Sequence, residues 1–193
     1  AVALFILAPL IMLSGSVALV LSGGGAKGGY EIGAWKALID LGVDLGGVYG
    51  TSVGSLNAAA VAQGDFDKAL DVWRNISEES VMKPTEAQRK LIEAYGGGSD
   101  WSLGELYQGA VDVINEGIDV TPLKELLSSV ISEEAVRNSS IDFGLVTFDL
   151  TDVRPEMLFI EDIPQGSLVD YLMASANFPG FKTVVIDGKA FVD

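Results

Sequence analysis

The sequence contains no histidine and no cysteine among its 193 residues. These absences exclude a Ser-His-Asp triad, a cysteine nucleophile, zinc and iron–sulfur sites built on these residues, and haem held by histidine. A catalytic group must therefore be a Ser, Thr, Asp, Glu, Lys or Tyr side chain, or a backbone dipole. The lack of disulfides also fits a reducing compartment.

Positive charge is scarce, because 12 Lys and Arg face 27 Asp and Glu, which gives a formal net charge of −15. Such a chain repels phosphate polyanions, so nucleic-acid binding is disfavoured, as is attraction to anionic lipid through basic clusters. Hydrophobic residues make up 49% and charged residues 20% of the chain. This balance predicts a folded protein, and the length suits one domain.

A hydrophobic run long enough to cross a bilayer is also missing. The apolar stretch at residues 1–13 is shorter than the roughly 20 residues that a spanning helix needs, and it lacks the basic front of a signal peptide. Residues 1–16 are therefore an apolar N-terminal segment of uncertain origin, either a truncated end or a surface or core element. The domain itself is expected over residues 17–193.

Residues 17–64 follow a strand, helix, strand, helix pattern. VALVL at 17–21 predicts a strand buried on both faces, and the following helix is expected to stop at Gly42. A second strand at 43–49 leads to a helix of small residues that ends at Gly64. This order predicts a parallel sheet covered by helices.

The rest of the chain predicts a helical middle and a return to strands. Four helices are expected in the middle of the chain. The first begins after a cap at Asp65, and the others cover 85–95, 102–114 and 121–131, the last with Thr121 as its cap. Strands are expected at 141–150 and 157–160, a helix at 167–176, and a terminal hairpin that turns at Asp187 and Gly188. No internal repeat or second domain is visible.

GGGAKG at residues 23–28 lies between the first strand and its helix, where backbone N–H groups and the helix dipole favour an anion. Gly23, Gly25 and Gly28 also satisfy GxGxxG, so the loop alone fits a bound pyrophosphate, a transient oxyanion, or a turn that only packs a helix on a strand. A Walker phosphate loop is excluded, because Gly28 follows Lys27 where that motif needs the lysine to precede Ser or Thr.

GTSVG at residues 50–54 matches GxSxG, the strand-to-helix elbow that exposes a serine hydroxyl. Ser52 falls at the C-terminal end of the second strand, beside the glycine loop, where ligands of open parallel sheets bind. A dinucleotide site needs an acidic residue at that point instead, and Asp44 comes too early. The elbow therefore favours a serine nucleophile over a dinucleotide.

A serine without histidine needs a carboxylate or a lysine as its base. Lys27 lies among N–H donors and better suits charge stabilisation. Asp193 closes the strand-like run AFVD, whereas Asp187 sits in a turn sequence; for any one Asp, a turn or cap remains the plain alternative. Asp142, Asp149 and Asp152 lack the spacing of a calcium loop, so no metal is expected.

Four blocks in order, GGGAKG, GTSVGS, ASANFPG and IDGKAFVD, resemble the patatin-like phospholipases in their bacterial form over residues 17–193. The resemblance implies a three-layer α/β/α fold with a mainly parallel central sheet. It also implies a Ser-Asp dyad, with Ser52 as nucleophile and Asp193 as base. Lys27 stands where the family more often has Arg, and the chain stops at Asp193, so the catalytic domain is expected to be truncated at its C-terminal end. The oxyanion loop carried over from the family consists of Gly23, Gly24, Gly25 and Gly28.

The resemblance thus implies a serine lipid acyl hydrolase of the phospholipase A, lysophospholipase or carboxylesterase type, with no cofactor. Its expected partners are a lipid ester and, transiently, a membrane surface, with the oligomeric state open. A cytoplasmic or peripheral-membrane location is expected, and secretion stays open. The alternatives are a dinucleotide-binding α/β protein and a non-catalytic lipid-binding module of the same fold.

Overall fold

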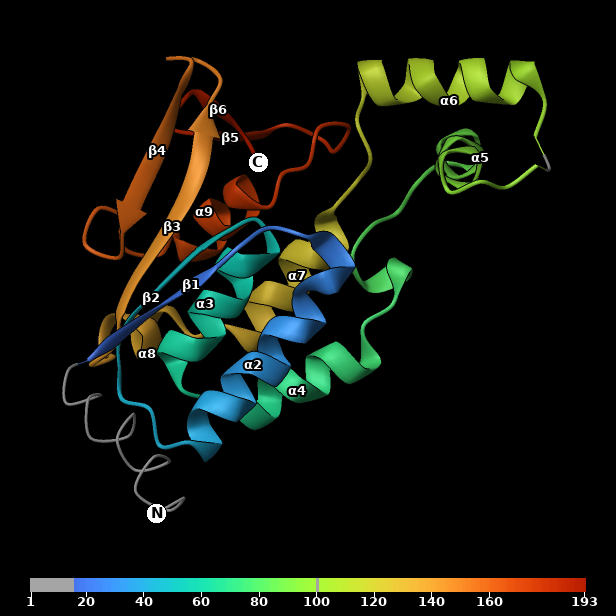
Figure 1. Cartoon of the computed structure of the whole chain (residues 1–193). Coiled ribbons are helices and arrows are strands. Elements are labelled where there is room, and N and C mark those ends of the chain that lie inside the picture. The colour runs from blue at the N-terminus through green and yellow to red at the C-terminus, as the bar shows by residue number, and fades with distance from the viewer. Residues whose placement is uncertain (1–15, 100) are drawn as a thin grey trace.

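The computed structural model describes residues 16–99 and 101–193, so the N-terminal segment expected at 1–16 lies almost wholly outside the described residues (Figure 1). Strands, helices and short 3-10 helices alternate along the chain. The strands are β1 (Val17–Leu21), β2 (Leu45–Thr51), β3 (Asp142–Asp149), β4 (Arg154–Phe159), β5 (Val184–Ile186) and β6 (Lys189–Val192). The helices are η1 (Gly25–Gly28), α2 (Gly29–Asp40), α3 (Val53–Gln63), α4 (Phe66–Asn75), η2 (Glu78–Ser80), α5 (Glu86–Tyr95), α6 (Leu103–Asn115), α7 (Thr121–Val130), α8 (Glu133–Arg137) and α9 (Leu168–Ser175).

The six strands form one sheet in the order β1-β2-β3-β6-β5, with β4 paired to β3. Only β1, β2 and β3 run parallel, whereas β4, β5 and β6 join through antiparallel pairs. The expected mainly parallel sheet is therefore a mixed one. The reason is that short turns connect β3 to β4 and β5 to β6, and a short turn can join only antiparallel neighbours.

The two edges of β3 are shared among three strands. β4 pairs with β3 along Gly144–Asp149 and so occupies one edge. β2 pairs with Asp142–Val146, and β6 pairs with Phe148 and Asp149. Because a strand has only two edges, β2 and β6 lie on the same edge of β3 and meet end to end beside Thr147.

The expected three-layer α/β class is confirmed. Helices α3 and α9 lie directly on the sheet, and α2, α4 and α7 pack against those two helices (Figure 1). The core between sheet and helices includes Val48, Phe143, Leu145, Leu168 and Leu172, each at most 2% exposed. Val48, Phe143 and Leu145 share one face of the sheet by register, and Leu168 and Leu172 of α9 belong to the same core, so one face of the sheet carries the core.

The prediction that β1 is buried on both faces is wrong. Val20 is 74% exposed, because β1 is the edge strand and its Val20 points to the face opposite α3. Met157 and Val185 lie on that same face by register and are also exposed. An apolar run fits a doubly buried strand, but burial depends on neighbours that the local sequence does not show.

Most predicted ends and caps agree with the structure. Asp65 accepts a hydrogen bond from the Lys68 amide, and the hairpin turns at Asp187 and Gly188 with positive φ angles of 50° and 80°. Thr121 is not a cap: Val120 occupies that position, and Thr121 begins α7 with its amide and hydroxyl both donating to the carboxylate of Asp119. Helix α8 was not expected.

Helices α5 and α6 pack against each other as a hairpin that projects from the body of the domain (Figure 1). Gln88 of α5 lies 2% exposed against α6 and donates a hydrogen bond to the carbonyl of Gly117. Among the described residues, every helix is too short or too polar to cross a bilayer.

Candidate active site

Ser52 lies on a sharp turn between β2 and α3. Its φ of 53° and ψ of −136° belong to a region that residues with a side chain rarely adopt. A Cβ added to Gly50 would lie only 2.2 Å from the carbonyl oxygen of Gly54. A Cβ added to Gly54 would lie only 2.5 Å from the carbonyl oxygen of Leu21. The two glycines are therefore required for this turn, as the GxSxG spacing predicts.

Two neighbouring serines hold the backbone of Ser52 in this conformation. The Ser52 amide donates to Ser175 Oγ at 3.0 Å, and Ser175 Oγ donates to the Val146 carbonyl at 2.6 Å. Ser55 Oγ donates to the Ser52 carbonyl at 2.7 Å. Ser175 is fully buried at the end of α9. Sequence reasoning noted its ASANFPG segment but assigned it no role, because the contact spans 123 residues.

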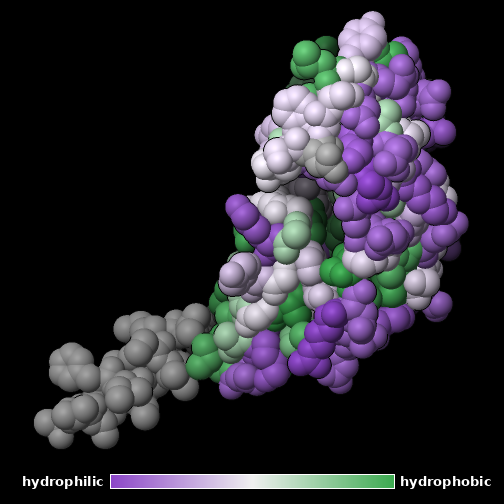
Figure 2. Space-filling view, turned by 90° about the vertical axis from the view of Figure 1, so that its right-hand side faces the viewer, coloured by the Kyte–Doolittle hydropathy of each residue, from purple (hydrophilic) through white to green (hydrophobic). Residues whose placement is uncertain are grey.

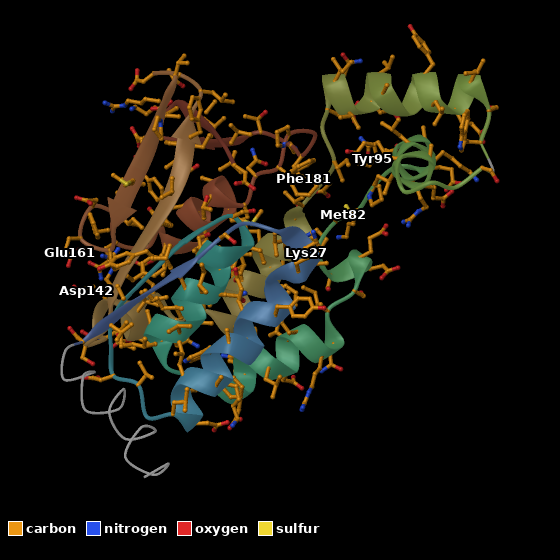
Figure 3. All side chains as sticks on the ribbon, viewed as in Figure 1. Lys27, Met82, Tyr95, Asp142, Glu161 and Phe181 are labelled. Carbon is orange, nitrogen blue, oxygen red and sulfur yellow. The ribbon has the colours of Figure 1, made fainter. Side chains whose placement is uncertain are left out.

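The glycine loop lies directly beside the elbow. A Cβ on Gly23 would lie 3.0 Å from Ser52 Cβ and 3.6 Å from Ser52 Oγ. In the part of the chain that the structure describes, the amides of Gly23 and Gly24 donate no hydrogen bond, and both residues are exposed. The loop thus presents free donors next to the serine. Gly28 is instead buried against Val53 and Trp73. The side chain of Lys27, in the same loop, is exposed (Figure 3).

Asp193 follows the last residue of β6. Val192 pairs with Phe148, and Thr51 pairs with Val146, so Ser52 and Asp193 each come one residue beyond a pair that flanks Thr147. The register therefore places both residues after strand ends that face each other along the same edge of β3. Over residues 16–99 and 101–193, no hydrogen bond joins the Ser52 hydroxyl to the carboxylate of Asp193.

Three hydrogen bonds hold the segment that ends at Asp193. The Asp193 amide donates to the Asn177 carbonyl at 2.9 Å, and Asn177 Nδ2 donates to the Phe191 carbonyl at 2.9 Å. Thr147 Oγ1 donates to the Val192 carbonyl at 3.1 Å. Thr147 and Asn177 are both buried. Neither was singled out from the sequence, because the strand register brings Thr147 to β6 and the turn after α9 brings Asn177 there.

Behind this segment, Lys189 binds a group of acidic side chains. Its Nζ lies 2.8 Å from Asp149 Oδ2, 2.7 Å from Asp152 Oδ2 and 3.6 Å from Glu156 Oε1. The hydrogen bond from Lys189 and those from the backbone amides of residues 151 and 152 lower the pKa of Asp149 to about 2, and the same carboxylates raise the pKa of Lys189.

The three carboxylates are close enough to share a cation. The ammonium group of Lys189 already supplies that charge, so the cluster stabilises the pairing of β6 with β3. Asp142 does not belong to this group, because it begins β3 at the far end of the strand (Figure 3).

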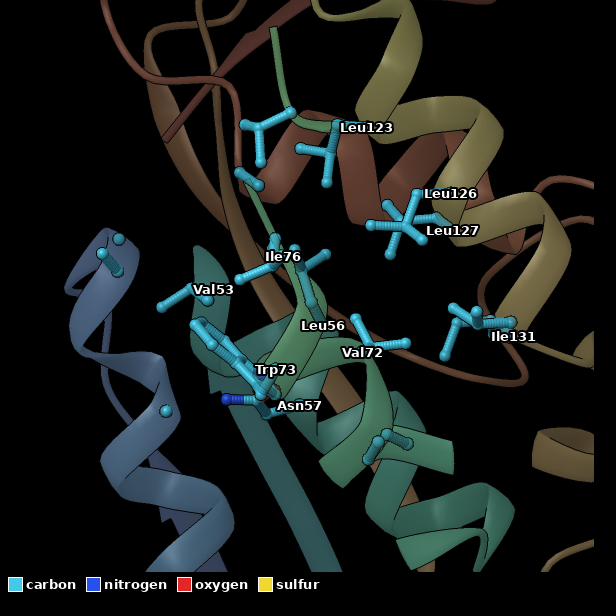
Figure 4. Close-up of a pocket in the computed structure, with 18 of the residues that line it drawn as sticks. Val53, Leu56, Asn57, Val72, Trp73, Ile76, Leu123, Leu126, Leu127 and Ile131 are labelled. Atoms are coloured by element: carbon cyan, nitrogen blue, oxygen red, sulfur yellow. The ribbon is translucent and has the colours of Figure 1, made fainter. Parts of the chain in front are cut away.

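A pocket of about 820 Å³ opens next to the elbow. Val53, the residue after Ser52, belongs to its wall, together with Gly25 and Ala26 of the glycine loop and Phe178 after α9. Most of the remaining wall consists of apolar side chains from α3, α4 and α7 (Figure 4). From the side of α5 and α6, the surface shows a hollow with hydrophobic residues in its walls below the hairpin (Figure 2).

Fold and site together define an α/β protein with a serine on a strand-to-helix elbow, faced by a glycine loop. The sequence profile of the patatin-like phospholipases matches residues 19–193, and the chain belongs to that family.

Two curated relatives show the extent of the likeness. The chain is 45% identical over 179 residues to the human patatin-like phospholipase domain-containing protein 6, and 46% identical over 184 residues to the lysophospholipase nte1 of Aspergillus terreus. The two alignments cover 93% and 92% of this chain, but only 11% and 10% of the relatives. The chain thus spans about a tenth of the length of the curated relatives it matches.

Among solved structures, VipD from Legionella pneumophila has a similar fold. The match has a TM-score of 0.55 and 20% identity, and covers 92% of this chain and 45% of that chain.

Proposed function

We propose that the chain hydrolyses carboxylic ester bonds of lipids with Ser52 as nucleophile and Asp193 as general base. The observation that supports this proposal is the register of β2 and β6, which both end beside Thr147 on one edge of β3, so that Ser52 and Asp193 follow the ends of two facing strands. The names of the relatives, a phospholipase domain protein and a lysophospholipase, support a lipid substrate.

In the proposed reaction, the carboxylate of Asp193 takes the proton of Ser52 Oγ while that oxygen attacks the ester carbonyl carbon. The amides of Gly23, Gly24 and Gly25 receive the oxyanion, and the charge of Lys27 assists them. The tetrahedral intermediate then expels the alcohol, which takes the proton back from Asp193. Water, activated by the same carboxylate, hydrolyses the acyl-enzyme. Gly28, buried under Trp73, holds the loop in place.

The pocket beside Val53 is proposed to take the acyl chain of the substrate. Its wall includes the loop residues next to Ser52 at one end and the aliphatic side chains of α7 at the other. A chain that enters from the elbow would therefore lie among apolar side chains, which favour its transfer from water. This arrangement supports esters with a long acyl chain over short, polar ones.

Transient contact with a lipid surface is proposed through α6. Leu103, Tyr107 and Ile114 recur on one side of this helix and are 80%, 73% and 81% exposed. Tyr95 and Trp101, which are also exposed, add aromatic rings of the kind that favour the interface of a bilayer. With a net charge of −15, the proposed surface is zwitterionic or neutral rather than anionic.

The catalytic proposal is tested by labelling with a fluorophosphonate and by hydrolysis of a long-chain nitrophenyl ester. The parent should label and turn over, while Ser52→Ala should do neither, with a loss of about 10⁴-fold or more. Asp193→Asn should retain the fold and lose most of the rate. Since the chain has no histidine, a rate profile dominated by a titration near pH 6.5 would contradict the mechanism.

Labelling, together with binding measurements, separates the two alternatives from the hydrolase. A lipid-binding module would bind a fatty acid without Ser52-dependent labelling, and a dinucleotide-binding protein would gain thermal stability from a nicotinamide nucleotide. Neither outcome is expected here.

The surface contact is tested by sedimentation with phosphatidylcholine vesicles. Replacing Leu103, Tyr107 and Ile114 together by Ser should lower binding, whereas Ser at the equally exposed Val20 and Met157 of the sheet should not. Equal losses from both sets would overturn the assignment of α6.

A further inference from the structure

The glycine loop and the pocket share a buried polar network that the proposed reaction does not use. Its centre is Asn57, on the second turn of α3, which is 4% exposed. Asn57 Nδ2 donates to the Gly28 carbonyl at 3.0 Å and to Glu31 Oε2 at 2.7 Å. Trp73 Nε1 donates to Asn57 Oδ1 at 2.8 Å. The amide of Asn57 thus uses both donors and its acceptor.

Trp73 fixes the orientation of this amide. An indole N–H can only donate, so the atom of Asn57 that faces it must be the oxygen, and both N–H groups point to Gly28 and Glu31. Burial raises the pKa of Glu31, while the hydrogen bond from Asn57 opposes that shift. The network therefore has one arrangement, and that arrangement holds the carbonyl of Gly28.

The ring of Trp73 also presses on the end of the loop. A Cβ on Gly28 would lie 2.8 Å from Trp73 Cζ2, and one on Gly29 would lie 3.4 Å from Trp73 Cε3. Trp73 and Asn57 both belong to the wall of the pocket, as do Gly25 and Gly29 (Figure 4). An occupant of the pocket would contact a ring that touches the loop on one side and binds Asn57 on the other.

We infer that Asn57 and Trp73 are positioning residues that couple occupation of the pocket by an acyl chain to the position of the glycine loop. The inference rests on the proposed function, because it assigns the pocket to the acyl chain and the loop to the oxyanion. A long chain packs against Trp73, which limits the motion of Gly28 and Gly29 and so fixes the loop donors beside Ser52. A short acyl group does not reach this wall, and its ester gains nothing from the network.

Gln63 offers a matched control on the same helix. It also belongs to the pocket wall, and it makes two comparable bonds, to the Val130 carbonyl at 3.1 Å and from the Ser132 amide at 2.6 Å. These bonds tie α3 to the end of α7 and do not involve the loop. A purely structural role of pocket polar groups should therefore give the same result for Gln63→Ala as for changes at Trp73.

The first experiment measures backbone hydrogen exchange over residues 23–29 with dodecanoate or butanoate as probes. In the parent, dodecanoate should slow exchange of the loop about threefold or more, and butanoate should leave it unchanged. Trp73→Phe keeps a ring over Gly28 and Gly29 but cannot donate to Asn57. In this variant dodecanoate should still bind, as measured by calorimetry, without slowing the loop. Gln63→Ala removes another contact of the pocket wall and should bind dodecanoate less tightly, but saturating dodecanoate should still slow its loop as in the parent.

The second experiment compares kcat and KM for dodecanoyl and butanoyl nitrophenyl esters. Trp73→Phe should lower kcat for the dodecanoyl ester about tenfold, with its KM and the butanoyl rate within about twofold of the parent values. Asn57→Leu removes the same network by deleting the amide that accepts from Trp73. If this variant folds, it should also lose kcat for the dodecanoyl ester and not for the butanoyl ester. If it does not fold, Trp73→Phe alone provides the test.

The inference would be overturned by an equal loss of kcat for both esters, by a change in KM alone, or by an equal loss of loop protection in Gln63→Ala and Trp73→Phe. Bound dodecanoate that leaves the parent loop unprotected would overturn it as well. Failure of the proposed function would give a different result. Activity that survives in Ser52→Ala would refute Ser52 as the nucleophile. The exchange experiment needs no turnover, so it would still decide whether the pocket and the loop are coupled.

Discussion

The two sides of the candidate site are built in different ways. The serine side consists of two successive strand–helix units over residues 17–64, and its shape is set by glycines within a few residues of Ser52. The aspartate side consists of the short strand β6, which is held by Thr147, by Asn177 and by the ion pair of its own Lys189 with Asp149. The first side depends on local backbone geometry and the second on contacts between distant segments.

This difference predicts how each side fails. On the serine side, the turn has almost no free space, so one added methyl group should damage the whole fold. On the aspartate side, each contact contributes separately, so single changes should loosen β6 and Asp193 while the rest of the domain stays folded.

The largest expected effect comes from Gly50→Ala on the serine side. The added Cβ would lie 2.2 Å from the Gly54 carbonyl oxygen and 2.5 Å from the Ser55 amide nitrogen, both backbone atoms that cannot move aside cheaply. We expect a loss of about 4 kcal/mol in the free energy of unfolding, or about 10 °C in Tm. Urea and thermal unfolding measure both values.

Gly33→Ala provides the matched control. Gly33 lies inside α2, and no atom would lie within 4 Å of its added Cβ. Alanine there should increase the free energy of unfolding by about 0.8 kcal/mol, because it favours the helix and restricts the unfolded chain. If both variants lost similar stability, the crowding of the elbow would not be the cause.

The next largest effect is expected for Lys189→Met on the aspartate side. This change leaves the fully buried carboxylate of Asp149 without its cation. The variant should unfold at a lower urea concentration than the parent, and amides of β5 and β6 should exchange faster than those of β1 and β2. Adding Asp149→Asn removes the unpaired charge and should restore part of the loss. A double variant weaker than Lys189→Met alone would contradict this explanation.

Most of the serine side could be predicted from the sequence, and little of the aspartate side. The elbow at Ser52 and the glycine loop depend on residues within a short window, as does the turn at Asp187 and Gly188 on the aspartate side. The proposed approach of Asp193 to Ser52 depends on the pairing of β6 with β3 and on the bonds of β6 to Thr147 and Asn177, which come from distant segments.

The wrong predictions have different origins: the burial of β1 depends on distant strands, whereas the cap of α7 depends on a side chain two residues before Thr121. The apolar run of β1 reads as a buried strand, but the edge position of β1 is decided by which strands pair. Thr121 reads as a cap, but the carboxylate of Asp119 takes both of its donors and Val120 becomes the cap. The pocket, and the network of Asn57 and Trp73, join α3, α4 and α7 in a way that no motif reports.

A pH series sharpens the comparison further. The pKa of Asp149 is about 2 in the folded protein and about 3.9 in an unfolded chain. A lowered folded pKa means that the stabilisation is present above about pH 4 and is lost as pH falls toward about 2. Urea midpoints of the parent should therefore fall through this window more steeply than those of Asp149→Asn. Equal slopes would show that the bond from Lys189 to Asp149 does not stabilise the fold.

The smallest expected effect is that of Thr147→Val, which removes the hydrogen bond from Thr147 Oγ1 to the Val192 carbonyl and nothing on the serine side. Valine keeps the shape of threonine, so the free energy of unfolding should fall by only about 1 kcal/mol. Turnover should fall by about tenfold, more than the small loss of stability suggests, because the bond lies one residue before Asp193 and a small shift of a base is costly.

Fluorophosphonate labelling and denaturation measure the two effects of Thr147→Val. Thr147→Ser keeps the hydroxyl and should recover most of the rate. If Thr147→Val lost stability without losing rate, the register of β6 would not matter to the reaction, and the division between a rigid serine side and an adjustable aspartate side would lose its functional meaning.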